Sequence, residues 1–330
     1  MERFVFVVAI IFAAIFALFG IVGGAHHFHI DVDGIGPDPI MPVAAGQAPQ
    51  QTFAGESIQF RHVAAHVTVV AEDRTDFAVE IVNPGHAPMP SVSVDEGRVV
   101  VDGHLGRRIA ECTSDDGAEL RGYATVSLAE MPQITVHAPR ALTISYNGAG
   151  RTEVSGASSV DVDLAGCGTV SAGDVAGNLK VDLAGSGHVR AGAIQHLEVD
   201  MAGSGGVETG AVANGANIDI GGSGTVIMAS LAGALESDSA GSGGVTVNGG
   251  ALTSADIELA GSGDASVAAT IQHAKVEILG SGDVTLSGQV GDIDASIAGS
   301  GDVHAASVTG AVRKDVMGSG NVIVGATNSQ

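Results

Sequence analysis

The sequence contains no tryptophan, and aromatic residues make up only 3% of its 330 positions. The hydrophobic core must therefore be slim and built from Val, Ala, Ile and Leu. Basic residues are also scarce, since 14 Lys and Arg stand against 37 Asp and Glu and give a formal net charge of −23. A surface of this charge repels nucleic acid and anionic lipid and attracts cations or basic partners. The composition thus argues against a nucleic-acid-binding role.

Glycine, by contrast, is abundant, and much of it lies in a Gly-Ser-Gly motif that recurs roughly every 19 residues. Two degenerate copies, Gly148-Ala149-Gly150 and Gly166-Cys167-Gly168, precede the regular ones. A fixed period of this kind indicates stacked copies of one structural unit. Between the motifs, apolar and polar residues alternate, as in Val181-Asp182-Leu183. This alternation predicts short strands with one buried face.

The repeat predicts an all-β fold, namely a parallel, three-sided β-helix or solenoid with one coil of about 19 residues per repeat. A single coil cannot bury its apolar side, so stacking must place each Val or Leu above its counterpart. We expect the motif glycines at corners, where a positive φ or the close approach of the next coil excludes a Cβ atom. These corner glycines are Gly185, Gly187, Gly203, Gly205, Gly222, Gly224, Gly241, Gly243, Gly261, Gly263, Gly280, Gly282, Gly299, Gly301, Gly318 and Gly320.

A phosphate-binding loop is the alternative interpretation of the glycine motif. Such a loop occurs once per domain and opens a helix. This motif instead recurs many times between strands, so the corner interpretation is favoured.

The amino-terminal segment is strongly apolar. Residues 4–22 carry no charge and are long enough to cross a bilayer as a helix. Arg3 precedes them and acidic sequence follows, which places the rest of the chain outside the cytoplasm. We therefore predict a membrane anchor or signal segment at residues 1–25. A cleaved signal peptide is the alternative, and it would make the protein secreted.

The remaining chain divides by composition. Residues 26–50, with three His and several Pro, are expected to form a flexible tether. Residues 51–140 look strand-like but do not follow the repeat, so we predict an irregular β cap with the first coils. Within them, residues 103–122 are expected to form an inserted polar loop. Regular solenoid repeats are predicted at 141–325, followed by a polar tail at 326–330.

An acidic residue stands three positions before the first glycine of nearly every repeat. Its neighbours are mostly apolar, so these carboxylates should face outward as a ladder. The ladder can be a solvated face that prevents lateral association, or a linear site for Ca²⁺ or a basic partner. Its members are Asp163, Asp182, Asp200, Asp219, Asp238, Glu258, Glu277 and Asp315, with Ser296 as the exception.

A shorter column follows the corners and consists of Asp264, Asp283, Asp302 and Asn321. It is similar to the calcium-binding nonapeptide β-roll, but that motif repeats every nine residues and supplies two ligand loops per coil. The period of about 19 residues therefore argues against a β-roll.

Cys112 and Cys167 are the only thiols of the chain. In an oxidising compartment they could form a disulfide that ties the 103–122 segment to the second corner. Two free thiols are the alternative, because the sequence does not place them within bonding distance.

One known family shares this layout of strands and repeats. The segments Phe60–Val70, Phe77–Val82, Arg98–Val101 and Ile134–Leu142, followed by Gly280-Ser281-Gly282-Asp283-Val284 and its copies, resemble the autotransporter-adhesin head family called the GIN domain. The resemblance covers roughly residues 55–325. It implies a right-handed β-helix in an exported bacterial protein and brings no catalytic residues with it.

The sequence therefore predicts a non-catalytic, exported β-solenoid of the bacterial cell envelope. We expect a structural or adhesin-like rod, anchored in the inner membrane with its solenoid in the periplasm, that presents an acidic face to ions, glycans or a protein partner. No cofactor is expected, and Ca²⁺ is the one candidate ion. The alternatives are a sensing or regulatory ectodomain and a polysaccharide-active enzyme. An enzyme of that kind needs carboxylates in unlike environments, which a ladder of like residues does not provide.

Overall fold

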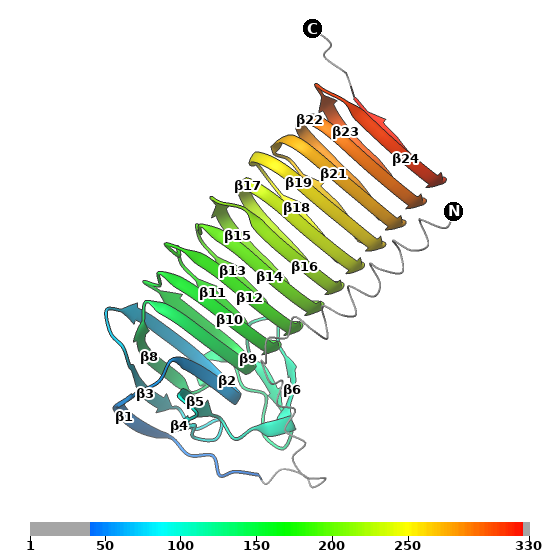
Figure 1. The fold of residues 1–330 in the computed structure, drawn as a ribbon. Coiled ribbons are helices and arrows are strands. Elements are labelled where there is room, and N and C mark those ends of the chain that lie inside the picture. Colours follow the sequence, from blue (N-terminus) through cyan, green and yellow to red (C-terminus); the bar gives the residue numbers. More distant parts are fainter. Residues whose placement is uncertain (1–39, 326–330) are drawn as a thin grey trace. The chain divides into compact units, whose positions relative to one another are not determined.

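A computed structural model describes residues 40–325, which lie within one compact unit. These residues form an all-β parallel solenoid of about ten turns with coils of about 19 residues (Figure 1). The helical elements within this range are two single turns of 3₁₀ helix, η1 (Gly106–Arg108) and η2 (Leu128–Glu130). The predicted span at residues 4–22 lies outside the described residues. No helix within residues 40–325 is long and apolar enough to cross a membrane.

The regular part of the solenoid is a continuous stack of parallel strands in which each strand pairs with its counterpart in the next coil. Its strands are β9 (Ala141–Ser155), β10 (Ser159–Gly166), β11 (Thr169–Ala172), β12 (Asn178–Gly185), β13 (His188–Ala191), β14 (His196–Gly203), β15 (Gly206–Val212), β16 (Ala216–Gly222), β17 (Thr225–Gly241), β18 (Gly244–Val247), β19 (Gly250–Gly261), β20 (Ala265–Val267), β21 (Thr270–Gly280), β22 (Val284–Gly299), β23 (Val303–Val308), β24 (Val312–Gly318) and β25 (Val322–Val324).

The strand register stacks equivalent repeat positions directly on one another, and this builds the core. One such stack, here called the inner column, runs through Val162, Val181, Val199, Ile218, Ser237, Ile257, Val276, Ala295 and Lys314. Every member before Lys314 is at most 1% exposed. Burial of apolar surface contributes about 25 cal/mol per Å². Because the aliphatic side chains of one coil are buried by those of the adjacent coils, each coil is stabilised only through its neighbours.

The first coil of the stack is out of chain order. Strand β2 (Ser57–Glu72) pairs along most of its length with β9, and its other edge pairs with β5 (Arg98–Asp102) and β8 (Gln133–Pro139). All of these pairings are parallel. A segment early in the chain thus lies between two segments that follow it.

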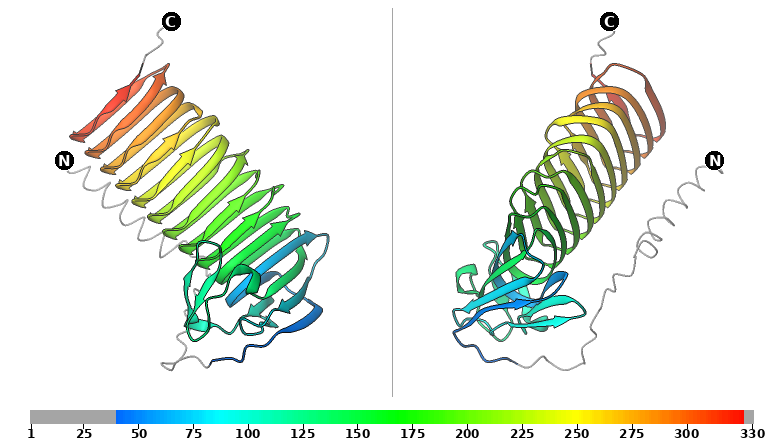
Figure 2. Two further views of the ribbon diagram at one scale, coloured as in Figure 1. Left: turned by 180° about the vertical axis from the view of Figure 1, so that it is seen from behind. Right: turned by 60° about the vertical axis from the view of Figure 1, so that its left-hand side comes forward.

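Antiparallel strands cover the amino-terminal end of the solenoid (Figure 2). Strand β3 (Phe77–Asn83) pairs with β8, β1 (Gly46–Phe53) pairs with β3, and β4 (Ser91–Asp95) pairs with β5. Strand β1 begins inside the range expected to be a tether, residues 26–50. Residues 46–50 therefore form part of a strand and not of a flexible tether. The strand forms through backbone pairing with β3, and an edge strand needs no apolar run of its own.

The 103–122 segment differs from the polar loop that its composition suggested. It contains η1 and a hairpin of β6 (Ile109–Cys112) with β7 (Ala118–Leu120). Three of its apolar side chains, Leu105, Ala118 and Leu120, are buried in a small second core together with Ala64 and Ala149 of the solenoid. The hairpin therefore packs on the side of the first coils.

The two glycines of each corner are needed for different reasons. The first has a φ in the left-handed region, as at Gly261 (+139°) and Gly280 (+142°). The second has an ordinary φ, but a Cβ atom added to Gly282 would meet the carbonyl oxygen of Gly263 in the preceding coil. An L side chain would be strained at the first position and would push adjacent coils apart at the second.

Replacement of a corner glycine should therefore be costly, while replacement of an open one should not. We expect Gly280→Ala to lower the free energy of unfolding by about 2–3 kcal/mol, because it combines positive φ with close backbone approach. Gly173→Ala is the matched control, since nothing lies within 4 Å of its added Cβ and its φ is ordinary. It should stay within about 0.5 kcal/mol of the wild type in denaturant unfolding. Equal losses in both variants would contradict the corner assignment.

Candidate binding face

The acidic residues predicted from the repeat form one column in the structure. The strand register pairs Asp163 with Asp182 and continues coil by coil through Asp200, Asp219, Asp238, Glu258, Glu277, Ser296 and Asp315. Most of the carboxylates alternate with buried aliphatic residues, and all of them are half-buried or exposed. The column, here called the acidic column, is thus continuous over nine coils apart from Ser296.

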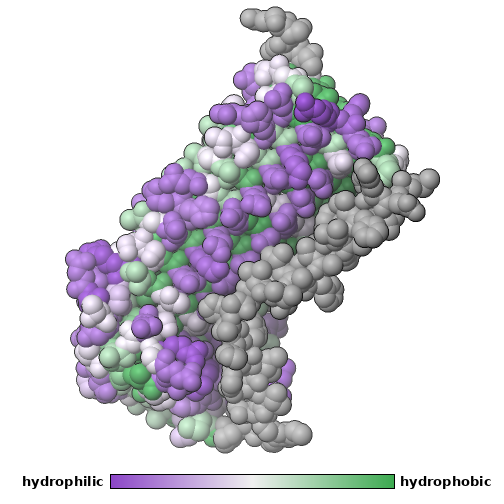
Figure 3. Space-filling view, viewed as in Figure 1, coloured by the Kyte–Doolittle hydropathy of each residue, from purple (hydrophilic) through white to green (hydrophobic). Residues whose placement is uncertain are grey.

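A second polar column lies beside the acidic column on the same face of the sheet. Its members stand two residues before the members of the acidic column. This column was not predicted from the sequence, although the position is polar in every regular copy. Its members are Asp161, Lys180, Glu198, Asn217, Glu236, Asp256, Lys275, Asp294 and Arg313. The two columns together define what we call the acidic face. Hydrophilic side chains recur along the length of the solenoid in the view of Figure 3.

Two lysines divide the acidic face into segments. The Nζ atom of Lys180 lies 2.7 Å from Glu198 Oε1 and within 3.9 Å of carboxylate oxygens of Asp182 and Asp200. The hydrogen bond to Glu198, above all, raises the pKa of Lys180. Each lysine bridges adjacent coils, because the coil spacing of about 4.8 Å matches the reach of an ammonium group between stacked carboxylates.

Lys275 acts in the same way nearer the carboxyl-terminal end. Its Nζ atom lies 3.1–3.3 Å from oxygens of Asp256, Glu258 and Glu277. Partial burial opposes its charge, but the hydrogen bonds to Asp256 and Glu277 outweigh that effect and raise its pKa.

The stretch between the two lysines is the most acidic part of the face. Partial burial, followed by repulsion from Glu258 and Asp219, raises the pKa of Asp238 to about 7. Partial burial and repulsion from Asp200 raise the pKa of Asp219 to about 6. Stacked like charges at coil spacing repel by nearly 1 kcal/mol per neighbour even in water. These carboxylates therefore bind protons, and would bind other cations, more readily than isolated ones do.

A compact group of carboxylates lies at the amino-terminal end of the face. One oxygen from each of Asp161, Asp163 and Asp182 lies within 4.8 Å of the others. Ser145 Oγ donates a hydrogen bond of 2.9 Å to Asp163 Oδ2. Burial raises the pKa of Asp182 to about 7, with repulsion from Asp200 and Asp163 adding to the effect and the charge of Lys180 opposing it. Carboxylate oxygens are the ligands that Ca²⁺ prefers, and such a group would need water to complete the coordination.

The shorter aspartate column has a different role. Asp264 Oδ1 accepts a hydrogen bond of 2.9 Å from the backbone N–H of Asp283, Asp283 accepts one from Asp302, and Asp302 accepts one from Asn321. Each carboxylate thus bonds to the corner of the next coil. These residues stabilise the stacking of the corners, so their chemistry does not require a metal.

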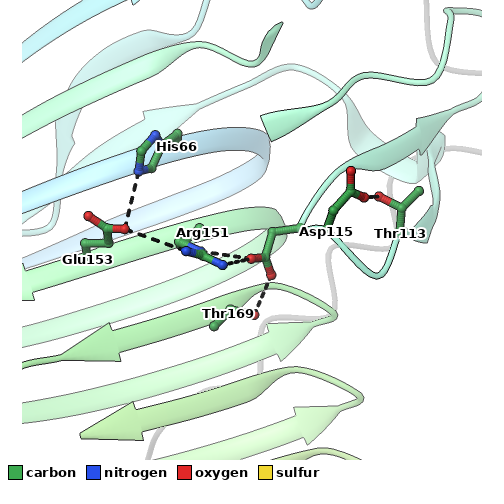
Figure 4. Close-up of polar contacts among 7 residues, drawn as sticks. His66, Thr113, Asp115, Arg151, Glu153 and Thr169 are labelled. Carbon is green, nitrogen blue, oxygen red and sulfur yellow. Dashed lines mark hydrogen bonds and ion pairs between the residues drawn. The ribbon is translucent and has the colours of Figure 1, made fainter. Parts of the chain in front are cut away.

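The β6–β7 hairpin is fixed beside the first coils by a disulfide and by charged groups. The structure joins Cys112 to Cys167, so the disulfide connects the hairpin to the second corner. In the hairpin turn, Asp116 Oδ2 accepts a 2.8 Å hydrogen bond from Arg151 Nε of β9, and its Oδ1 accepts one of 2.7 Å from Thr169 Oγ1. Figure 4 shows Arg151 between this turn and Glu153, whose Oε1 lies 3.8 Å from His66 Nε2 of β2.

The acidic face makes the stability of the fold pH-dependent. The raised pKa values of Asp219 and Asp238 mean that the folded state binds protons more tightly than the unfolded state, in which an aspartate has a pKa near 3.9. The free energy of unfolding should therefore rise as the pH falls from about 8 to about 5. We expect the double variant Asp219→Asn/Asp238→Asn to flatten this dependence in denaturant unfolding at a series of pH values.

The matched control removes two carboxylates from the hairpin, where Glu111 and Glu119 face each other across β6 and β7. Glu111→Gln/Glu119→Gln should keep the full dependence between pH 8 and 5. A slope that falls equally in both double variants would assign the effect to net charge and not to the acidic face.

The disulfide should contribute measurably to stability. The loop-entropy model gives roughly 4 kcal/mol for a bridge that closes this 55-residue separation. We expect reductant to lower the melting temperature of the wild type and to leave Cys112→Ser/Cys167→Ser unchanged. A wild type that melts identically with and without reductant would contradict the contribution.

Several solved structures are similar to this chain at low sequence identity. One is described as "Putative lipid binding protein" from Parabacteroides distasonis; it is 18% identical, with a TM-score of 0.38 over 87% of this chain and 99% of that one. A "putative adhesin" from the same organism is 13% identical, with a TM-score of 0.39 over 87% of this chain and 100% of that one. A "putative adhesin" from Parabacteroides merdae is 15% identical, with a TM-score of 0.39 over 84% of this chain and 95% of that one.

A comparison with curated protein sequences finds no match. The sequence profile of one family, described as "Putative auto-transporter adhesin, head GIN domain", matches residues 93–211 and 238–330. These ranges make up most of the chain, and they include the hairpin, most of the acidic face and most of the corner glycines; Asp219 and Gly222 lie in the unmatched stretch between them. The resemblance inferred from the repeats is thereby confirmed: the chain belongs to the GIN-domain family of auto-transporter adhesin heads.

Proposed function

We propose that the protein is an exported, non-catalytic, adhesin-like rod of the bacterial cell envelope whose acidic face binds a cationic partner. Family membership and fold point to an adhesin-like protein that is not an enzyme. The apolar segment at residues 4–22 supports anchorage in the inner membrane with the solenoid on the periplasmic side. The finer parts of this proposal, the location and the partner, rest on the sequence and on the charge of the face.

The observation that carries the proposal is the register of the two polar columns. Carboxylates repeat at the coil spacing of about 4.8 Å along a single flat face. Between Lys180 and Lys275 the carboxylates outnumber the cations, and partial burial together with repulsion from neighbouring carboxylates raises the pKa values of Asp219 and Asp238. A partner with regularly spaced positive groups would relieve this repulsion and gain many weak contacts at once.

The geometry also explains why the face suits binding better than catalysis. General acid–base chemistry needs two groups whose environments push their pKa values apart. Neighbouring members of the acidic column, such as Asp219 and Asp238, have the same kind of surroundings, and the pKa values of both are shifted in the same direction. Repetition therefore multiplies equivalent contacts and does not create distinct roles.

Binding of a lysine homopolymer tests the proposal with a simple cationic partner. We expect Asp219→Asn/Asp238→Asn to bind the polymer several-fold more weakly than the wild type in fluorescence anisotropy at moderate ionic strength, because two carboxylates of the most acidic stretch of the face are lost. The control Glu111→Gln/Glu119→Gln loses the same charge elsewhere and should bind almost as the wild type does. Equal weakening of both variants would mean that net charge alone attracts the polymer, and the acidic face would have no special role.

The same proteins distinguish an ion from a macromolecular partner. If the face holds calcium, millimolar Ca²⁺ should raise the melting temperature of the wild type more than Na⁺ of equal ionic strength does, and chelator should reverse the rise. Loss of that rise in Asp219→Asn/Asp238→Asn would place the ions between the two lysines. No difference between Ca²⁺ and Na⁺ would leave the polymer-binding result as the test of the proposal.

A further inference from the structure

The carboxyl-terminal coil is the last coil of the described residues, and its far edge lacks a neighbouring strand there. Among the described residues, strands β24 and β25 pair only with β22 and β23 of the preceding coil. The open end has a hollow of about 390 Å³ whose lining includes Lys314, Val316 and Val322. Apolar side chains that would be buried in any other coil are accessible here, for example Val312 at 38% exposure. Such an edge is a template for pairing with another strand.

Lys314 stands at an unexpected position in this coil. It belongs to the inner column, where its predecessor Ala295 is 1% exposed and all earlier members are aliphatic apart from Ser237. The neighbouring positions on the same strand, Val312 and Val316, continue apolar columns of the core. The charge therefore lies at the end of the hydrophobic core and not on the outer face.

The other lysines show that this position is specific to the last coil. Lys180 and Lys275 both lie on the outer face and bridge carboxylates of adjacent coils. Arg313, one residue before Lys314, also lies in an outer column, in register with Asp294. The terminal strand thus carries one cation outside and one at the core position.

We propose that Lys314 prevents the carboxyl-terminal coil from pairing with the same coil of a second copy of the chain. Another coil stacked on β24 and β25 would bury the ammonium group among valines without a counter-charge, which is strongly unfavourable. The second copy would meet this end with its own carboxyl-terminal coil, since the amino-terminal end of the described solenoid is covered by β1, β3 and β4. Contact between the same surfaces on both copies generates a closed dimer.

Substitution of the lysine by an apolar residue tests the proposal. In light scattering coupled to size-exclusion chromatography, Lys314→Val should shift the apparent mass towards twice that of the wild type as the protein concentration rises. The wild type and Arg313→Val should keep the monomer mass, because the second variant removes the same charge from the outer side of the same strand. A monomeric Lys314→Val at every concentration, equal dimerisation of Arg313→Val, or a wild type that is itself dimeric through this end would overturn the proposal.

Two further variants separate charge from side-chain size and locate the contact. Lys314→Glu keeps a charge at the core position and should remain monomeric; its dimerisation would show that charge is not the barrier. In Lys314→Val/Val316→Lys the charge is moved to the neighbouring apolar column, and the dimer should be lost again. A double variant that stays dimeric would place the contact elsewhere on the molecule and would exclude the carboxyl-terminal coil.

Discussion

Every coil of the described solenoid is held to the preceding one by backbone hydrogen bonds at a spacing of about 4.8 Å, and the glycines at the corners permit this close approach. At the corner, the carbonyl oxygen of Gly263 occupies the place that a Cβ atom of Gly282 would need. At this spacing equivalent repeat positions lie directly above one another, with local register shifts at Gly233/Ala234 and between Leu286 and Gln289. The side chains of one position therefore share one environment, whether this is the core or the solvent.

This constraint has opposite consequences inside and outside the solenoid. In the core, stacked aliphatic side chains such as Ile257 and Val276 fill the space between coils and stabilise them. On the outer face, the same spacing brings like charges together, and repulsion from Glu258 and Asp219 adds to partial burial in raising the pKa of Asp238. The two lysines that bridge adjacent coils compensate part of the repulsion. The remaining repulsion arises from stacking and not from a folded pocket, and it is the basis of the cationic partner proposed above.

The sequence predicted those features that depend on the period and failed on those that depend on contacts between distant segments. The 19-residue repeat was enough to place Asp182 above Asp163 and to assign the corner glycines. It could not reveal that β2 lies between β8 and β9, because this pairing joins segments far apart in the chain and leaves no periodic signal. The hairpin core around Leu105 and Leu120 was missed because so few apolar residues build it.

The second polar column was missed for a different reason. The residues directly next to most of the acidic residues are buried, so they give no sign of a second polar position. The residue two positions earlier lies on the same face of the sheet as the acidic residue, because side chains alternate between the two faces. Lys180 and Glu198 belong to that face, and the ion pairs between coils follow from the stacking alone. The charge pattern of a solenoid is therefore best analysed by comparing equivalent positions of successive coils, and not consecutive residues of the chain.

A repeat of equivalent coils contains nothing that determines its own length, since each coil offers the next the same edge. At both ends of the described solenoid, residues break the repeat. At the amino-terminal end, antiparallel strands cover the first coil and change the direction of pairing. At the other end the chain keeps the strand pattern but places a charge, Lys314, where the core would continue. The regularity that gives the solenoid its uniform acidic face also gives each coil an edge that can pair, and by the proposal above Lys314 keeps this edge from pairing with a second molecule.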